Sequence, residues 1–345
     1  DQNGQMWFGS DTGLYMRGAK LLRVSHRRLS RSSTGSGEHG PQAQVNGLLA
    51  DRRGGLWIGA NPGMLHNEDG RFSNRGKEIG ERQVYDVLQA RDGAVYAATR
   101  HGVWRSLGEG AFEQLPTTPM ARCLMEDSEG GLWVGYGQNQ GLDYFRNSVA
   151  RTILSELRVN CVHEDPEGAL WIGSFSGLHR LRDGRTTTYG VADGLPDQNV
   201  QTIAADRQNR LWIGTRKGLA QWSDGELTAL AAPSQLAQAD VSSLYVDRDG
   251  AIWCALSSGG GFVLRGDALR KLPELNHGRI DWFLEDARGR LWIGHEYGLF
   301  RCEEGRIRPV VDAAFARLNS SHFTCCYDAG EGTLWMGTSG GIVRY

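Results

Sequence analysis

The stretch "DRQNRLWIGTRKGL", residues 206–219, decides the fold because the chain repeats it. Close copies occur as "DPEGALWIGSFSGL" at residues 165–178 and "DARGRLWIGHEYGL" at residues 286–299. Nine copies align on one aromatic anchor each, and the eight spacings from the first anchor to the last average 41 residues. A period near 40 residues is typical of the four-stranded blades of a β-propeller. The anchors are Trp7, Trp57, Tyr96, Trp133, Trp171, Trp212, Trp253, Trp292 and Trp335.

Each position of the repeat predicts a structural role. The residues on both sides of the anchor are apolar in all nine copies, which indicates a strand buried on both faces. The second residue after the anchor is always Gly or Ala, as at Gly173 and Ala255, so we expect another chain segment to approach closely there. Asp stands six residues before the anchor in seven copies, and Gly or Asn stands three before it in all nine, which predicts a hairpin turn.

These strands predict an all-β fold, a β-propeller of four-stranded antiparallel blades that spans residues 1–345. A third strand is expected after each Gly-apolar pair, as at Gly218-Leu219, and a weaker fourth strand closes each unit. Nine motifs leave the blade count open: eight or nine blades, or a seven-bladed ring plus the start of a second. Residues 26–40, first basic and then rich in Gly and Ser, are predicted to form a mobile loop insertion, with a basic docking site as the alternative.

The composition excludes several classes of function. The formal net charge of −2 gives no general attraction to nucleic acid or to an anionic membrane, and no apolar run reaches 18 residues. The six cysteines show neither a CxxC pair nor zinc-ligand spacing, so we expect buried free thiols, which favours a reducing compartment. The repeated Asp turn lacks the later Glu of a calcium loop. We therefore expect no metal and no cofactor.

Residues 193–222, "DGLPDQNVQTIAADRQNRLWIGTRKGLAQW", closely resemble the two-component regulator propeller repeat. The shared pattern runs GLP, then N-x-V, then I-x-x-D-x-x-G-x-LWIGT-x-x-GL, and related copies cover essentially the whole chain. The resemblance implies the periplasmic sensor part of a bacterial membrane receptor whose histidine kinase or diguanylate cyclase output lies outside this chain. Members often carry fourteen repeats in two seven-bladed rings. The chain departs from that pattern: the first copy lacks its first strand and the last copy lacks its fourth, as in a piece of a longer receptor.

Function is expected in the columns of the repeat that vary. The loop between the second and third strands and the connection from the fourth strand to the next blade open on the same face of a propeller, around its channel mouth. Amides, guanidinium groups and aromatic rings there suit a small polar ligand such as an oligosaccharide. The predicted ligand-binding residues are Arg100, His101, Arg122, Arg158, Asn160, Phe175, Gln201, Arg216, Lys217, Asp281, His295 and Tyr297.

Catalytic alternatives have weaker support from the residues. Acidic residues recur seven before the anchor, and two of them could form a glycosidase pair. We expect them at strand ends next to the Asp turn, on the face opposite the variable loops, where exposure to solvent explains them more simply. These acids are Glu126, Glu164, Glu285 and Asp328. The nine histidines form no HxH or HExxH pattern, and no Ser-His-Asp order stands out. We therefore expect no enzyme in this chain.

Two other functions stay open. The first is a streptogramin-lyase-like or carbohydrate-active propeller enzyme, because such lyases share a similar "G-x-lW" repeat. The second is a non-catalytic protein-interaction scaffold, since fold alone does not choose between functions. The expected partner is a small polar ligand. A homodimer would form through the parent receptor, with no nucleic acid and no membrane contact by this segment.

Overall fold

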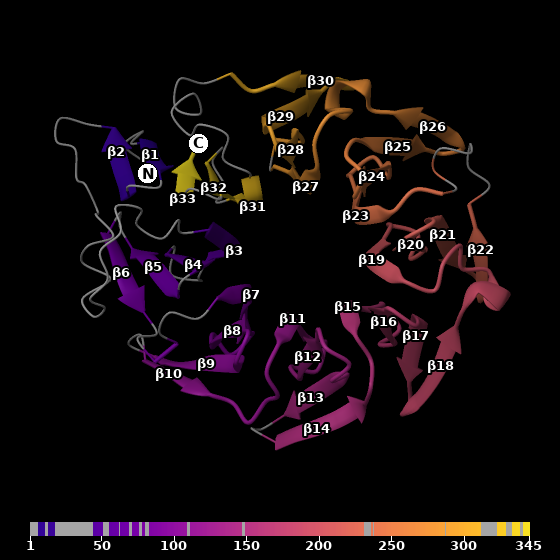
Figure 1. Ribbon diagram of the computed structural model, residues 1–345, viewed down its shortest axis with the longest axis horizontal. Coiled ribbons are helices and arrows are strands. Elements are labelled where there is room, and N and C mark those ends of the chain that lie inside the picture. The colour runs from indigo at the N-terminus through magenta and orange to yellow at the C-terminus, as the bar shows by residue number, and fades with distance from the viewer. Residues whose placement is uncertain are drawn as a thin grey trace. The chain divides into compact units, whose positions relative to one another are not determined.

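Nine antiparallel sheets, seven of them four-stranded, account for the strands of the described residues (Figure 1). The structure is a computed structural model that describes residues 6–10, 13–17, 44–50, 55–61, 63–68, 71–75, 78–79, 83–108, 111–146, 149–230, 236, 238–286, 288–311, 323–328, 333–338 and 341–345. The predicted loop at residues 26–40 lies outside these ranges. In each four-stranded sheet the strands pair in chain order, as a propeller blade requires.

The complete blades have the following bounds. The first three contain β3 (Gln44–Ala50), β4 (Leu56–Asn61), β5 (Met64–Glu68) and β6 (Arg71–Arg75); β7 (Val84–Gln89), β8 (Val95–Thr99), β9 (Gly102–Gly108) and β10 (Ala111–Gln114); and β11 (Ala121–Glu126), β12 (Leu132–Tyr136), β13 (Leu142–Arg146) and β14 (Val149–Leu154). The next two contain β15 (Val159–Glu164), β16 (Leu170–Ser174), β17 (Gly177–Arg182) and β18 (Arg185–Tyr189); and β19 (Val200–Ala205), β20 (Leu211–Thr215), β21 (Gly218–Ser223) and β22 (Glu226–Ala229). The last two contain β23 (Val241–Val246), β24 (Ile252–Leu256), β25 (Gly261–Arg265) and β26 (Ala268–Lys271); and β27 (Ile280–Glu285), β28 (Leu291–His295), β29 (Gly298–Glu303) and β30 (Arg306–Pro309).

The remaining elements are short. The first motif forms a two-stranded sheet, β1 (Met6–Ser10) and β2 (Gly13–Arg17), and the last forms a three-stranded sheet, β31 (Phe323–Asp328), β32 (Leu334–Thr338) and β33 (Gly341–Arg344). Two 3-10 helices, η2 (Val191–Asp193) and η3 (Pro273–Leu275), interrupt connections between blades. The all-β fold of four-stranded antiparallel blades is therefore confirmed. Within the described residues, seven motifs build complete four-stranded blades, fewer than the eight or nine that the motif count also allowed.

The chain divides into two compact units. Unit 1 contains residues Asp1–Ala97, Trp104–Glu113 and Leu284–Tyr345, and unit 2 contains residues Ala98–Val103 and Gln114–Phe283. In unit 2, the first strands of consecutive blades, β11, β15, β19 and β23, lie side by side (Figure 1). In unit 1, β31 lies between β28 and β3, and β33 lies beside β1 from the opposite end of the sequence.

The repeated Trp and Gly join each blade to the next. Trp212 is 4% exposed and shares a core cluster with Val241 of the following blade. A Cβ atom on Gly214 would lie 2.8 Å from Val241 and 2.7 Å from Thr202, closer than real Cβ contacts. The small position after the anchor therefore lets the next blade approach, as the sequence predicted.

The repeated Asp fixes both the hairpin turn and the anchor. Asp206 Oδ1 accepts hydrogen bonds from the backbone N–H groups of Gln208 (2.9 Å) and Arg210 (3.0 Å), and Oδ2 accepts one from Trp212 Nε1 (3.0 Å). The bond from the indole to this Asp recurs at Trp133, Trp171, Trp253 and Trp292. Two copies have Ala in place of the Asp: Ala90 precedes Tyr96, whose phenol ring has no indole N–H to satisfy, and Ala329 precedes Trp335.

Burial also acts on the titratable groups of the blades. Burial opposes ionisation of Asp206, but hydrogen bonds from Trp212 and Arg210 outweigh it and hold the pKa of Asp206 below its usual value. All six cysteines are free thiols, as predicted, and burial raises the pKa of Cys161, Cys254 and Cys325 to about 12.

Within the described residues, no helix is long and apolar enough to cross a membrane.

Candidate functional site

The variable loops of unit 2 lie together on one surface. The loop between the second and third strands of one blade bonds the connection that leads into the next: Gly141 N–H donates to Leu157 O at 2.8 Å, and Gly218 N–H donates to Ala239 O at 2.8 Å. We call the surface formed by residues 99–102, 118–122, 136–141, 155–160, 174–177, 197–201, 215–218, 238–242, 256–260 and 276–281 the loop face. The surface of the Asp hairpins and of the turns between third and fourth strands in the same unit is called the turn face.

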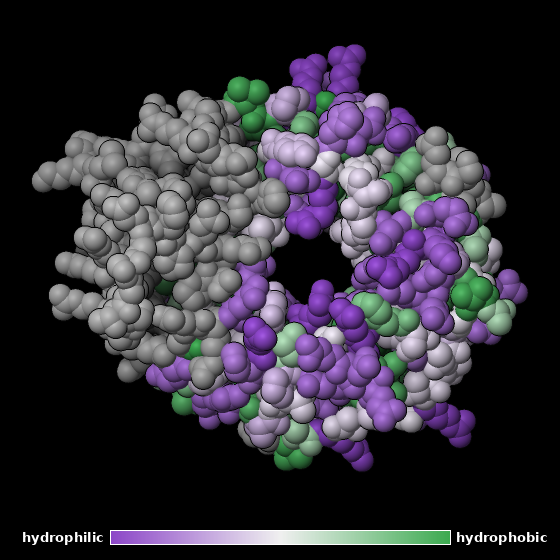
Figure 2. Space-filling model, in the orientation of Figure 1, coloured by the Kyte–Doolittle hydropathy of each residue, from purple (hydrophilic) through white to green (hydrophobic). Residues whose placement is uncertain are grey.

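Ten of the twelve predicted ligand-binding residues lie on the loop face. Six of them are exposed: Arg100, His101, Arg122, Arg158, Arg216 and Lys217. Four are half-buried: Asn160, Phe175, Gln201 and Asp281. Hydrophilic side chains gather near the ends of β15 and β19 in the space-filling view (Figure 2).

The remaining two predicted residues, His295 and Tyr297, belong to unit 1. His295 ends β28 and is 2% exposed, and its ring lies 5.2 Å from that of Phe300, edge to face. Its Nδ1 accepts a hydrogen bond from Tyr297 N–H at 3.1 Å. Thr215 and Ser174 occupy the same column of the repeat and bind the loop backbone in the same way. His295 therefore supports its loop from below, whereas Tyr297 is 68% exposed.

Half-buried residues at the start of the first strand join neighbouring blades. Asn160 occupies a β-bulge between Val159 and Cys161, and its Nδ2 donates to Val200 O of the next blade at 2.7 Å. In unit 1, Asn46 Nδ2 donates in the same way to Val84 O at 2.8 Å. This column therefore contributes inter-blade hydrogen bonds, a role that the sequence pattern alone did not reveal.

Arg158 and Phe175 are two predicted residues of the loop face that contact each other through their side chains. The Arg158 guanidinium carbon lies 3.9 Å from the centroid of the Phe175 ring, and Phe175 N–H donates to Arg158 O at 3.2 Å. The cation–π contact and the backbone bond hold the guanidinium at an exposed position. A flat aromatic ring and a planar cation are thus presented together on the loop face.

Farther along the loop face, cations are matched by acids. Arg216 Nε lies 3.7 Å from Asp240 Oδ2, and Gln201 Nε2 donates to Asp240 Oδ1 at 3.2 Å. Lys217 Nζ lies 3.6 Å from Asp197 Oδ2. Arg279 and Asp281 make a third pair on this face, at 2.7 Å.

Sequence reasoning missed the conformation of two loop-face residues. Met120 and Glu156 have φ angles of 66° and 60°, in the left-handed region that non-glycine residues rarely adopt. Met120 N–H donates to Arg100 O at 2.8 Å, and Met120 O accepts from Gly137 N–H at 3.1 Å. Met120 therefore ties two variable loops together through its backbone, which offsets the cost of its conformation.

Buried polar groups also support the loop face from below. His179 lies between Ser174 Oγ and Thr188 Oγ1, at 2.9 Å from each, and burial lowers its pKa. In the preceding blade, Tyr136 OH donates to Asp143 Oδ2 at 2.8 Å, and burial raises the pKa of Tyr136. These groups are enclosed beneath the loops rather than presented to solvent.

The acidic residues that suggested a glycosidase pair lie next to the hairpin turns. Glu164 accepts hydrogen bonds at 2.7 Å from both the backbone N–H and the hydroxyl of Ser128 in the preceding blade. Glu164 therefore joins two blades on the turn face. Among the described residues, no group of three His, Cys, Asp or Glu side chains could hold a metal ion.

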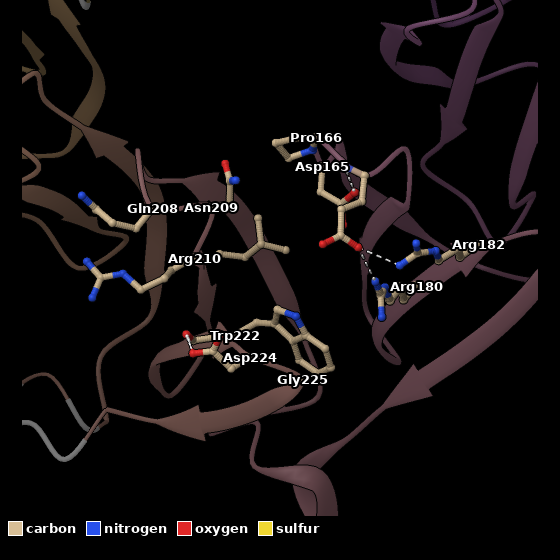
Figure 3. A pocket seen from close by; sticks show the side chains of 13 residues that line it. Asp165, Pro166, Arg180, Arg182, Gln208, Asn209, Arg210, Trp222, Asp224 and Gly225 are labelled. Carbon is tan, nitrogen blue, oxygen red and sulfur yellow. Dashed lines mark hydrogen bonds and ion pairs between the residues drawn. The ribbon is translucent and has the colours of Figure 1, made fainter.

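A pocket of about 500 Å³ also opens on the turn face, between the blades of β15–β18 and β19–β22 (Figure 3). Arg182 and Arg180 both face Glu167, at 2.7 and 3.9 Å. Trp222 lines the pocket, and its ring lies 4.9 Å from the ring of Trp171. These charges largely satisfy one another, so the pocket shows no excess of one sign.

The fold is a β-propeller of four-stranded blades, each built on one copy of the repeat. Three segments, residues 153–176, 194–217 and 274–297, match the family described as two component regulator propeller. The sequence of these three repeats is thus similar to the family that the resemblance named. No curated protein matches the chain at a significant level.

Solved structures share the fold. The extracellular domain of the hybrid two component system BT3049 from B. thetaiotaomicron is 15% identical over 99% of this chain, with a TM-score of 0.52, and this chain covers 60% of it. A catalytically inactive virginiamycin B lyase from Staphylococcus aureus, solved with quinupristin, is 14% identical over 88% of this chain and 95% of its own, with a TM-score of 0.57. YCF48 bound to D1 peptide is 12% identical over 91% of this chain and 99% of its own, with a TM-score of 0.59. At these identities the likeness extends to the fold alone.

Proposed function

We propose that this chain is the extracytoplasmic ligand-sensing propeller of a bacterial signal-transduction receptor, and that it binds a small polar ligand on the loop face of unit 2. The family of the repeats supports the sensor role. One observation supports this location for the binding site. The residues that repeat in every blade make contacts between blades, whereas the variable residues Arg100, Arg122 and Arg158 are exposed on the loop face.

The loop face has the groups that a polar ligand needs. Phe175 and the guanidinium above it offer a flat apolar surface beside a fork of N–H donors, which suits the face and the hydroxyl edge of a sugar ring. The backbone bonds between adjacent loops fix these groups before a ligand arrives, which lowers the ordering cost of binding. Chemical output would belong to a kinase or cyclase outside this chain.

Hydrogen exchange tests this proposal without requiring that the ligand be known in advance. The full chain would be incubated with maltotriose, cellotriose, trigalacturonate, sulfated maltotriose and a trialanine peptide in turn, and amide exchange would be followed by mass spectrometry. We expect at least one compound to protect residues 118–122, 155–160 and 174–177 and to leave the hairpins at residues 127–130 and 165–168 unchanged. Protection confined to the hairpins, or no protection by any compound, would contradict a loop-face site.

The enzymatic alternative makes a different prediction for the same samples. A lyase or glycosidase would convert one of the compounds, and mass spectrometry of the supernatant would detect the product. We expect every compound to be recovered intact. Turnover that disappears in Glu164→Gln would instead support chemistry at the turn face.

A further inference from the structure

Three arginines on the loop face have no acidic partner among the described residues. Arg100, Arg122 and Arg158 are exposed, and none of them makes an ion pair with a described carboxylate. Glu156, the one exposed acid on the connection next to Arg158, also makes no ion pair with a described residue. This region, from Arg100 to Phe175, is called the arginine strip.

The arginine strip differs from the rest of the same face. Beyond the strip each acid is matched by a cation, as Asp240 is by Arg216 and Asp197 is by Lys217. Within the strip three guanidinium groups face a single unpaired carboxylate. The positive charge is therefore concentrated on one part of a chain whose formal net charge is −2.

The backbone brings the three arginines onto a continuous strip of loops. Met120 N–H is bonded to Arg100 O, and Arg122 follows two residues later. Arg122 lies against Gly137: a Cβ atom added to that glycine would be 3.5 Å from Arg122 Cδ. The same loop ends at Gly141, whose N–H is bonded to Leu157 O, immediately before Arg158.

Two features shape the backbone and one guanidinium of the arginine strip. Met120 and Glu156 stand directly before the segments that carry Arg122 and Arg158, and both adopt left-handed φ angles. Such a conformation is unfavourable for a non-glycine residue. In addition, Arg158 is held over Phe175 rather than left to extend freely into water. Exposed arginines that make no ion pair with a described carboxylate are free to bind oxyanions bidentately.

We propose that the ligand of the loop face carries two or more oxyanion groups, and that Arg100, Arg122 and Arg158 bind them. This inference rests on the proposed function and adds to it the chemical class of the ligand, an acidic oligosaccharide whose sugar rings lie against Phe175. Carboxylate and sulfate share the chemistry that the arginines recognise. The two sources are separated by the probes below.

Isothermal titration with three trisaccharides tests the inference. The probes are trigalacturonate, its trimethyl ester, which has the same sugars without the charges, and sulfated maltotriose. We expect at least one anionic probe to bind the full chain, with an affinity that falls as sodium chloride rises from about 50 mM to about 500 mM, and the ester to bind at least about tenfold more weakly.

Matched arginine variants locate the charges. Arg122→Ala and Arg158→Ala should each weaken the anionic probe about tenfold or more, because a charge-assisted hydrogen bond contributes about 1.5–3 kcal/mol. Arg146→Ala and Arg182→Ala remove exposed arginines from the turn face, where Glu129 and Glu167 pair with them, and should change the affinity less than about twofold. Circular dichroism of each variant checks that the blades remain folded.

The outcomes separate this inference from the function on which it rests. If the ester binds as tightly as the acid, or if only the turn-face variants lose affinity, the oxyanion inference is overturned while a neutral-ligand sensor stands. If none of the three probes binds, the inference is also overturned. The proposed function is then decided by whether maltotriose, cellotriose or the peptide protects the loop face from hydrogen exchange.

Discussion

The turn face and the loop face of unit 2 share the four blades from β11 to β26, yet they use the residues of these blades in opposite ways. On the turn face, Asp127, Asp165, Asp206 and Asp247 make the same set of bonds to their turns and to their tryptophans. On the loop face, the residues that accept the equivalent loop N–H groups are Met120, Arg158, Asn199 and Asp240, four different side chains on one backbone pattern. We infer from this difference that the repeated residues stabilise the blades, and that the variable residues are free to recognise a ligand.

The largest expected effect comes from removing an anchor. Trp212→Ala should lower the free energy of unfolding by about 3–5 kcal/mol, because it leaves a cavity between two blades. Phe175→Ala removes a half-buried ring from the loop face and should cost only about 1 kcal/mol. Urea unfolding followed by circular dichroism compares the two. Equal losses would mean that the two faces do not divide stability and recognition as stated.

A smaller loss is expected at the Asp that holds each anchor. Asp247 accepts bonds from Asp249 N–H, Ala251 N–H and Trp253 Nε1. Asp247→Ala leaves a buried indole N–H unsatisfied and should cost roughly 2–4 kcal/mol. Asp249→Ala, two residues away in the same turn but exposed, should change stability by less than about 0.5 kcal/mol. If the two variants had equal unfolding midpoints, the Asp–Trp bond would have no special weight.

Most of the blade architecture could be predicted from the sequence because the residues that determine it recur in copy after copy of the motif. A strand buried on both faces, a turn that needs Asp and Gly, and a close approach at Gly214 each occur in several copies, so chance agreement is excluded. The Asp–Trp bond was less evident. Ala replaces the Asp both in the copy anchored on Tyr96 and in the copy anchored on Trp335, so the Asp does not change together with the anchor.

The details of the loop face could not be read in the same way. The position of Asn160 at a β-bulge depends on strand register, and its bond to Val200 depends on how two blades meet. His295 looked like a loop residue because its motif reads "LWIGHEYGL", although it occupies the column of Thr215 and is buried. Which arginines lack a partner is likewise set by side chains from distant parts of the sequence. Variable columns have no second copy to reveal their role.

A smaller loss of stability is expected at Asn160, a loop-face residue with a structural role. Asn160 was predicted to bind ligand, but it donates to Val200 O of the next blade. Asn160→Ala should lower the free energy of unfolding by about 1–1.5 kcal/mol, because the carbonyl loses its partner. Arg122→Ala, in the same column but exposed, should leave thermal stability nearly unchanged. A stability loss at Arg122 equal to that at Asn160 would show that the column acts as one structural unit.

The smallest expected effect is a dependence of stability on pH between 7 and 6. Burial holds the pKa of His163 and His179 below the ordinary value of 6.5, although Asp165 and Glu164 oppose the shift at His163. As pH falls through 6.5, the unfolded chain takes up protons at these positions before the folded chain does. The stability present at pH 7 is therefore partly lost, by less than about 1 kcal/mol for each histidine at pH 6. The lowered pKa of Asp206 affects stability only below about its ordinary value of 3.8, so it does not contribute between pH 7 and pH 6.

Urea unfolding at pH 7 and pH 6 measures the loss of stability, and the double variant His163→Gln with His179→Gln should reduce that loss. An unchanged pH dependence in the double variant would show that other groups titrate in this window.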